Sequence, residues 1–282
     1  MKIPKRFKPL IEDGLINEVI QTIMSGKEAT LYIVRCGAEI RCAKVYKEAN
    51  KRSFKKSVQY QEGRKVKNSR RARAMEKGSK YGKQQQEETW QNAEIDSLRK
   101  VRDCGVRVPE TFGCFDGVLL MELITDKNNQ VAPRLADISM TEATAIEEHS
   151  IIINFIVLML CAGIIHGDLS EFNVLIGKNG AVIIDLPQAV DAASNNNAEL
   201  MFKRDVNNMT RYFANYAPKL INTSYAEEIW GRYEDGSLHP GITLSGVFKE
   251  PSALANVDTV IQEIKAALAE EEARLARAKE AD

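Results

Sequence analysis

Two polar motifs beside apolar runs constrain the fold of this chain most strongly. The first is HGDLSEFNVL at residues 166–175, and the second is VIIDLPQA at residues 182–189. The first motif is too polar for a core and too closely framed by apolar residues for a mobile loop, and the second places an aspartate at the end of a hydrophobic run. We therefore expect a loop and a following β-hairpin, at 173–177 and 181–185, with Asp185 at the end of its second strand.

Asp168, Asn173 and Asp185 supply the oxygen groups that a phosphoryl-transfer site needs. Such a site places a cation on the nucleotide phosphates, ligands on a metal ion and a carboxylate near the acceptor hydroxyl. Mg²⁺ prefers oxygen ligands and usually takes only one or two from the protein. Asn173 and Asp185 can therefore hold the metal, while Asp168 supplies a third oxygen group that need not bind it.

The region before these motifs has the pattern of a small antiparallel sheet followed by a helix. Short segments rich in Ile, Val and Tyr, separated by turn residues, predict three strands. A further hairpin is indicated by the Asp116-Gly117 turn. The predicted strands lie at 17–24, 29–35 and 40–46, the helix at 89–105 and the hairpin at 114–124.

The region after a polar stretch at 126–134 is mainly helical by pattern. One helix is predicted to begin near Ser139 or Thr141 and to end near Cys161. Further helices are predicted at 197–216, 223–236 and 257–280. The predicted fold is α+β with two lobes: a β-rich lobe at 1–125, a mainly helical lobe at 126–255 and a charged terminal helix at 256–282.

Composition excludes several classes of protein. The formal net charge is zero, and the five cysteines form no CxxC pair, so neither a zinc site nor a disulfide framework is expected. The N-terminus lacks the apolar core of a signal peptide. The longest apolar run, at 151–165, is too short to span a bilayer and predicts a buried helix. We therefore expect a cytoplasmic protein without a membrane partner.

A basic insert at 48–88 interrupts the β-rich lobe. Between Lys51 and Lys83 there are thirteen Lys or Arg residues against two acids. The insert is either a solvated loop or an arm that contacts RNA phosphates and stacks bases on residues such as Tyr60 and Tyr81. The second interpretation allows RNA or a ribosomal particle as a partner.

These motifs, taken in order, resemble the RIO family of atypical serine/threonine protein kinases, in its branch with a basic insert and without a winged-helix domain. HGDLSEFNVLI is similar to the catalytic loop of that family, and IIDLPQAV to its metal-binding segment. The resemblance covers roughly residues 17–215. Its further motifs are SGKEATLY (25–32), AKVY (43–46), TWQNAEIDSL (89–98), MELI (121–124) and KRDVNNMTRYF (203–213).

The resemblance implies a protein-kinase-like fold that binds ATP with Mg²⁺, or with Mn²⁺ in its place. It implies that Lys44 contacts the α- and β-phosphates and that Glu94 fixes Lys44. Asp168 would orient or deprotonate the acceptor, and Asn173 and Asp185 would hold the metal. The remaining nucleotide-binding residues that it implies are Ser25, Gly26 and Lys27 at the phosphates and Met121, Glu122 and Leu123 at the adenine.

The resemblance also implies a second role for Asp185, as the nucleophile of an aspartyl-phosphate cycle. Two alternatives to a protein kinase therefore stay open: an ATPase that acts as a ribosome or RNA assembly factor, and a small-molecule phosphotransferase, some of which carry HGDL-like loops. The chain departs from conventional kinases in having a single glycine in its phosphate loop and no A-P-E segment. We interpret His166 and Asp205 as structural supports of the catalytic loop.

Overall fold

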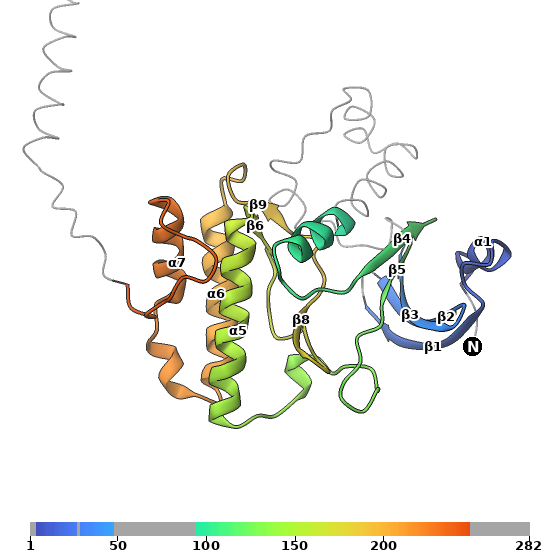
Figure 1. Cartoon of the computed structure of the whole chain (residues 1–282), viewed down its shortest axis with the longest axis horizontal. Helices are drawn as coiled ribbons and strands as arrows, with labels where there is room; N and C mark the ends of the chain where they lie inside the picture. Colours follow the sequence, from blue (N-terminus) through green and yellow to red (C-terminus); the bar gives the residue numbers. More distant parts are fainter. Residues whose placement is uncertain (1–3, 27–28, 48–93, 249–282) are drawn as a thin grey trace, which may run out of the picture. The chain divides into compact units, whose positions relative to one another are not determined.

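The computed structural model describes residues 4–26, 29–47 and 94–248 (Figure 1). Residues 1–246 form one compact unit, and a second unit spans residues 247–282. Three predictions therefore lie outside the described residues: the basic insert at 48–88, the phosphate contact of Lys27 and the terminal helix at 256–282.

The N-terminal part is a five-stranded antiparallel sheet in the order β1-β2-β3-β5-β4. Both the three predicted strands and the predicted hairpin are confirmed. A short helix that the sequence pattern did not predict, α1 (Phe7–Glu12), packs Phe7 and Leu10 onto one face of the sheet. The strands are β1 (Glu18–Ser25), β2 (Ala29–Cys36), β3 (Glu39–Tyr46), β4 (Thr111–Phe115) and β5 (Val118–Glu122).

The central strand β3 is buried from Cys42 to Tyr46. Its side chains alternate between the two faces of the sheet. Ala43 and Val45 pack into the small core beneath α1, whereas Cys42 and Lys44 point to the opposite face, towards the rest of the chain. The alternation therefore directs one charged side chain from the middle of the sheet into the molecule.

The C-terminal part is mainly helical, which confirms the predicted α+β class. Its longest helix begins where expected: Thr141 caps it, and the Thr141 hydroxyl accepts a hydrogen bond of 3.2 Å from the Thr144 N–H. The helices are α5 (Glu142–Cys161), α6 (Ala198–Ala214) and α7 (Tyr225–Glu234), with 3₁₀ turns η3 (Leu135–Asp137) and η4 (Pro218–Asn222). Residues 94–103 form a further helix, within the predicted range.

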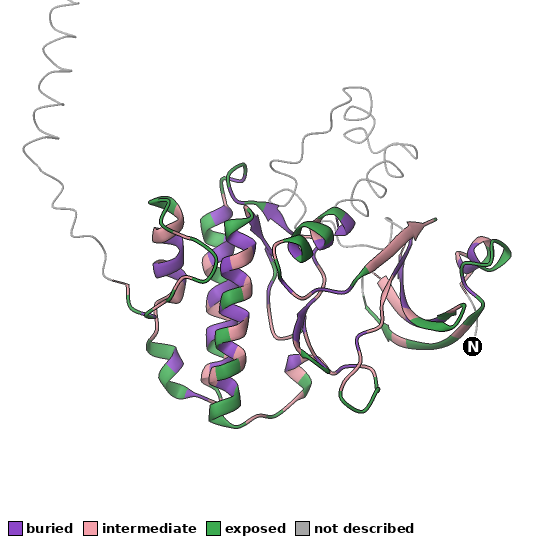
Figure 2. Ribbon diagram, in the orientation of Figure 1, coloured by how far each residue is buried: buried purple, intermediate pink, exposed green. Residues whose placement is uncertain are grey.

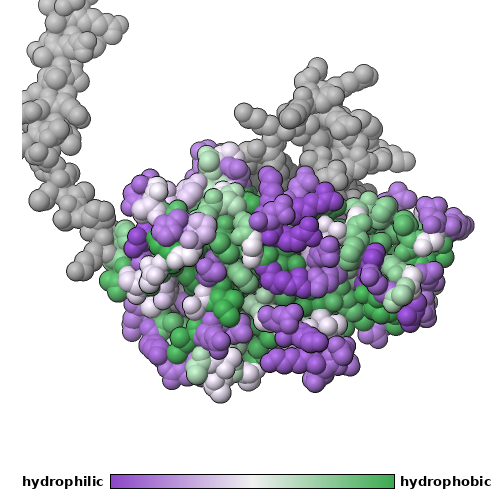
Figure 3. All heavy atoms as spheres, viewed as in Figure 1, coloured by the Kyte–Doolittle hydropathy of each residue, from purple (hydrophilic) through white to green (hydrophobic). Residues whose placement is uncertain are grey.

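Helix α5 is the one described helix that is long and apolar enough to cross a membrane. Core helices of globular proteins pass the same test of length and composition. α5 contacts α6, α7 and β8, and its buried apolar residues, purple in Figure 2, belong to the main core. On the face seen in Figure 3, hydrophilic and hydrophobic residues are interspersed over this part of the chain. Burial in the core therefore accounts for the apolar composition of α5, as predicted for 151–165.

Two short pairs of strands carry the polar motifs. β6 (Ile164–Ile165) pairs with β9 (Val190–Asp191), and β7 (Val174–Gly177) pairs with β8 (Gly180–Ile183). The β7–β8 hairpin confirms the prediction, except that β8 ends two residues before Asp185. Asp185 has φ = +66°, a left-handed conformation that a strand does not accommodate. The two polar motifs are therefore held by short strands on either side.

Candidate active site

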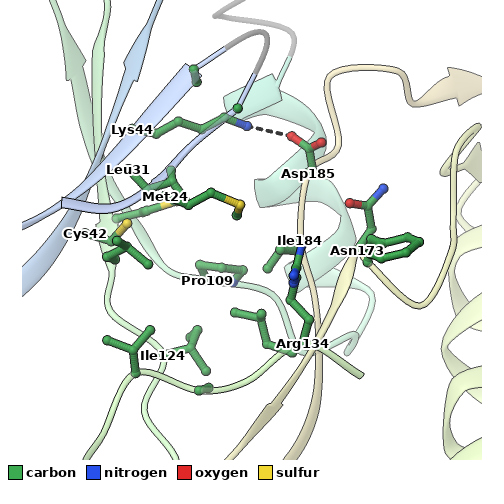
Figure 4. A pocket seen from close by; sticks show the side chains of 18 of the residues that line it. Met24, Leu31, Cys42, Lys44, Pro109, Ile124, Arg134, Asn173, Ile184 and Asp185 are labelled. Carbon is green, nitrogen blue, oxygen red and sulfur yellow. Dashed lines mark hydrogen bonds and ion pairs between the residues drawn. The ribbon is translucent and has the colours of Figure 1, made fainter. Parts of the chain in front are cut away.

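A cleft of about 750 Å³ lies between the sheet and the polar motifs. Its walls come from β1–β3, from the segment after β5, from the helix at 94–103 and from the loops after β6 and β8 (Figure 4). The structure thus brings together most of the predicted site residues, although Ser25 does not line the cleft. The predicted residues that line it are Gly26, Lys44, Glu94, Met121, Glu122, Leu123, Asp168, Asn173 and Asp185.

Lys44 lies at the centre of this arrangement. Its Nζ is 2.6 Å from Oε1 of Glu94 and 2.7 Å from Oδ1 of Asp185, the contact drawn in Figure 4. Lys44 is 8% exposed and Glu94 1%. Burial disfavours the charged amine, but Asp185 and Glu94 outweigh it and raise the pKa of Lys44. The side chain is therefore a fixed cation inside the cleft.

Asp185 is ionised for a related reason. Burial works against its charge, but the ammonium of Lys44 and, to a smaller extent, the ring of His166 outweigh that effect and lower the pKa of Asp185. The side chain is still 40% exposed, and it faces the cleft. Among the residues that the structure describes, no hydrogen bond reaches its second carboxylate oxygen. Asp185 can therefore offer oxygen to a cation or to phosphorus.

Asn173 and Asp168 are fixed by one hydrogen bond within their loop. Nδ2 of Asn173 donates to the carbonyl oxygen of Asp168 over 2.9 Å, so the amide nitrogen is engaged. Figure 4 shows the amide oxygen of Asn173 on the side towards Asp185. The Asp168 carboxylate is exposed at the same cleft, where a substrate hydroxyl can approach it.

The oxygen groups of Asn173 and Asp185 fit a magnesium ion that also binds phosphate. In the described part of the chain, no cluster of three or more His, Cys, Asp or Glu residues could hold a metal ion alone. Mg²⁺ commonly takes one or two protein oxygens and completes its shell with phosphate and water. The donor set therefore matches a metal that arrives with a nucleotide.

The loop that carries Asp168 is held by Asp205 of α6. Its carboxylate accepts hydrogen bonds from the N–H groups of Gly167 (2.7 Å) and Leu169 (3.1 Å). Burial raises the pKa of Asp205 to about 7, although both N–H groups and Arg204 act in the opposite direction. The predicted role of Asp205 as a structural support agrees with this geometry.

His166 supports the loop from the other side. Its Nε2 lies 3.0 Å from the carbonyl oxygen of Ile184, the residue before Asp185. Burial lowers the pKa of His166, although the Ile184 carbonyl, Asp185 and Asp168 oppose the change. The ring is almost fully buried, so it links the two polar motifs and is not placed to take a proton from a substrate.

In the predicted phosphate loop, both the N–H and the carbonyl oxygen of Gly26 are hydrogen-bonded. The Gly26 N–H donates to the carbonyl oxygen of Ala29 over 2.9 Å, and Lys47 Nζ donates to the Gly26 carbonyl oxygen over 2.5 Å. The hydroxyl of Ser25 pairs with that of Thr30 at 3.2 Å, which is consistent with its position outside the cleft.

At the far end of the cleft, Glu122 is already engaged at several atoms. Its N–H donates to the Glu110 carbonyl oxygen (2.8 Å), and its carboxylate forms hydrogen bonds of 2.5 and 2.9 Å with Arg107. Burial disfavours the Glu122 charge, but Arg107 prevails and lowers the pKa of Glu122. The N–H and the carboxylate of Glu122 are therefore engaged within the protein.

Several cleft residues were missed by the sequence interpretation. Nε2 of Gln188 lies 3.5 Å from Oδ2 of Asp168, and Phe172 is 51% exposed with the Arg134 guanidinium 5.6 Å from its ring centroid. Arg134 forms a forked ion pair with Asp137, with distances of 2.8 and 3.1 Å. Gln188 follows Asp185 in the second motif, so its position was a usable signal. The Arg134–Asp137 pair had no local signature.

Comparisons with known proteins agree with the family resemblance of the sequence motifs. The family model described as the RIO domain matches residues 31–226. The RIO-type serine/threonine-protein kinase Rio1 of Haloferax volcanii is 30% identical over 229 residues, which cover 80% of this chain and 74% of that protein. The kinase rio1 of Schizosaccharomyces pombe is 29% identical over 210 residues, 72% of this chain but only 40% of that protein.

A solved structure shows the same fold. The complex of the Rio2 kinase from Chaetomium thermophilum with ADP, Mg²⁺ and phosphoaspartate superposes with a TM-score of 0.54 at 20% identity. The match covers 76% of this chain and 65% of that one. The predicted two-lobed, protein-kinase-like architecture is therefore confirmed.

Proposed function

Because the chain belongs to the RIO family of serine/threonine protein kinases, we propose that it uses ATP and Mg²⁺ to phosphorylate a protein hydroxyl, including one of its own. The observation that carries the proposal is the position of Lys44, between Glu94 and Asp185 and in one cleft with Asn173 and Asp168. A phosphotransferase needs this set of a cation, metal ligands and a carboxylate for the acceptor.

The nucleotide lies with its adenine at residues 121–124 and its phosphates at Lys44 and Gly26. Apolar side chains such as Leu31 and Ile184 line the space between and exclude water from the base. Lys44 neutralises the α- and β-phosphates, and Asn173 and Asp185 would hold Mg²⁺, which would supply positive charge to stabilise the transferring phosphate. In this proposal Mn²⁺ can replace Mg²⁺. The proposed lobes of the fold are residues 1–125 and residues 126–255.

The transfer step takes place at Asp168. The acceptor hydroxyl oxygen forms a bond to the γ-phosphorus, the bond to the bridging oxygen of ADP breaks, and the hydroxyl proton passes to the Asp168 carboxylate. The exposure of this carboxylate supports the role, because a protein side chain must reach it from outside. Asp205 and His166 support the loop, and this support keeps the Asp168 carboxylate at a fixed position relative to the metal ligands.

A second output of the same site is ATP hydrolysis through Asp185. In that cycle a carboxylate oxygen of Asp185 attacks the γ-phosphorus, ADP leaves, and water later cleaves the acyl phosphate. The Rio2 structure that contains ADP, Mg²⁺ and phosphoaspartate supports this proposal, as does the cleft-facing carboxylate of Asp185.

An RNA or ribosomal partner remains a proposal from sequence alone, because the basic residues at 51–83 lie outside the described residues. A location in the cytoplasm likewise rests on the composition. Family membership favours a protein acceptor over a small molecule.

The test uses γ-labelled ATP with Mg²⁺ and the purified chain, wild type beside Asp168→Asn. Free phosphate and label on the protein are followed before and after a hydroxylamine wash, which cleaves acyl phosphates. Wash-resistant label that is lost in Asp168→Asn is the result expected of a kinase, and wash-sensitive label with free phosphate is expected of the aspartyl-phosphate cycle. The absence of both label and free phosphate would overturn the proposal.

A further inference from the structure

Both carboxylate oxygens of Glu94 are bound by residues of one strand. Oε1 accepts a hydrogen bond of 2.6 Å from Lys44 Nζ, and Oε2 accepts a hydrogen bond from the Tyr46 hydroxyl. Lys44 and Tyr46 are two positions apart in β3, so their side chains leave the same face of the sheet. Tyr46 and Glu94 are each only 1% exposed.

This arrangement restrains Glu94 more than the ion pair alone. A carboxylate that is bound at one oxygen can still rotate about its terminal bond, whereas one that is bound at both oxygens is fixed in plane and direction. The Tyr46 hydroxyl remains a donor, because burial first and Glu94 second raise its pKa well above the usual value. A hydroxyl that donates to a buried carboxylate forms a strong, charge-assisted hydrogen bond.

Tyr46 is itself rigidly placed. Its ring lies in the main core, in the same cluster as Ile95 and Leu98 of the helix that carries Glu94. The Lys44 ammonium lies 5.6 Å from the centroid of the ring, within the range of a cation–π contact. Tyr46 therefore contacts both members of the ion pair and is absent from the lining of the cleft.

We propose that Tyr46 is a positioning residue for nucleotide binding: it fixes Glu94, and through Glu94 it fixes Lys44 on the α- and β-phosphates. The inference rests on the proposed function, because it takes ATP as the ligand of Lys44. It assigns Tyr46 no contact with the acceptor, so its removal should change nucleotide affinity and leave the transfer step nearly intact.

The first test measures the dissociation constant for Mg·ATP by calorimetry, and kcat for transfer, with the full chain. Tyr46→Phe keeps the ring and removes the hydroxyl. Loss of one such hydrogen bond predicts a rise in Kd of roughly fivefold to tenfold, with kcat within about twofold of wild type. The matched control is Tyr216→Phe, which removes a hydroxyl that donates to the Ile138 carbonyl oxygen (3.1 Å) outside the cleft. Its Kd and kcat should equal those of wild type.

A second measurement separates positioning from packing. In a Glu94→Ala background the proposed partner of the hydroxyl is gone, so adding Tyr46→Phe should change Kd by less than about twofold. With Glu94 already replaced, removal of the Tyr46 hydroxyl leaves no buried carboxylate without a hydrogen-bond donor. The double variant therefore tests whether the hydroxyl acts through Glu94 even where Tyr46→Phe alone unfolds. Thermal unfolding of each variant checks that it is folded.

Two results would overturn the inference. One is an unchanged Kd in Tyr46→Phe, and the other is an equal rise of Kd with and without Glu94, which would mean that the hydroxyl acts through packing. A wild-type chain that fails to bind Mg·ATP would instead overturn the proposed function, so the two failures are distinguishable.

Discussion

The ammonium of Lys44 lies 2.7 Å from a carboxylate oxygen of Asp185, although 141 positions separate the two residues in the sequence. Lys44 belongs to the middle of the sheet, and Asp185 follows the β7–β8 hairpin of the helical part. The cation proposed for the phosphates and the carboxylate proposed for the metal are therefore held together by direct contact. Charge balance in the cleft depends on both parts of the fold.

Replacing Lys44 by Met should weaken both nucleotide binding and the fold. The variant keeps the apolar stem and removes the charge, which leaves Glu94 and Asp185 without their shared cation. We expect the Mg·ATP affinity to fall by about tenfold or more, since a charged hydrogen bond is lost. We expect the free energy of unfolding to fall by about 3 kcal/mol, because a buried ion pair is broken. Calorimetry and urea unfolding measure the two effects.

Lys178→Met provides the control for that variant. Lys178 is an exposed lysine in the turn between β7 and β8, away from the cleft. The Lys178→Met variant should match wild type in its affinity for Mg·ATP and in its free energy of unfolding. A Lys44→Met chain with wild-type affinity would show that the ion pair does not serve the nucleotide.

Replacing Gln188 by Ala should slow the transfer step. The Gln188 amide is 3.5 Å from Asp168, so it helps to orient that carboxylate towards the acceptor. We expect kcat to fall by roughly threefold to tenfold with little change in the KM for ATP, the result of losing one weak hydrogen bond. Steady-state kinetics with varied ATP measures both constants, and a rise in KM alone would contradict the assignment.

Replacing Asp205 by Asn should displace the catalytic loop. An amide can accept one of the hydrogen bonds from Gly167 and Leu169, but its NH₂ group then faces the other N–H. We expect kcat to fall by about tenfold or more while Mg·ATP affinity changes little, because the loop carries Asp168. Asp235→Asn, at the exposed end of α7, is the control and should keep wild-type kcat. A kcat of Asp205→Asn equal to that of wild type would contradict the role of Asp205 as a support of the loop.

Much of the local structure could be predicted from the pattern of residues in the sequence. The strands of the sheet, the Thr141 cap of α5 and the β7–β8 hairpin were predictable because alternation, turn residues and capping are local properties. The support of the loop by Asp205 was also foreseen. That the candidate residues of the two polar motifs line one cleft could be expected, because they lie on short, recognisable segments.

What could not be predicted depends on contacts between distant segments. The hydrogen bond from Tyr46 to Glu94 depends on where the helix at 94–103 docks against β3, and no spacing rule fixes that position. The left-handed backbone of Asp185 shortened the expected strand β8, because the residue type alone does not reveal its φ angle. The pair of Arg134 and Asp137 likewise becomes part of the cleft only through the fold.

The buried histidine of α5 predicts a pH dependence of stability. Burial lowers the pKa of His149 from 6.5 to about 4, and its ring contacts the Thr210 hydroxyl at 3.1 Å. Between pH 6.5 and pH 4 the unfolded chain takes up a proton at His149 and the folded chain does not. The free energy of unfolding therefore falls as the pH drops through this window, by about 2 to 3 kcal/mol at pH 4.5.

Urea unfolding of wild type and His149→Gln at pH 7.5 and pH 4.5 tests this account. The wild type should lose about 2 to 3 kcal/mol more on acidification than the variant. His239→Gln, which replaces an exposed histidine, should lose as much as wild type. Identical losses in wild type and His149→Gln would contradict the account.

The most direct test of the proposed division of roles compares the affinity for Mg·ATP of Asp168→Asn and Asp185→Asn. Asp168 acts on the acceptor, so its variant should bind Mg·ATP within about twofold of wild type while kcat falls by about 10²- to 10⁴-fold. Asp185 holds the metal, so its variant should bind Mg·ATP about tenfold or more weakly. Equal affinity for Mg·ATP in the two variants would contradict the roles assigned to both residues.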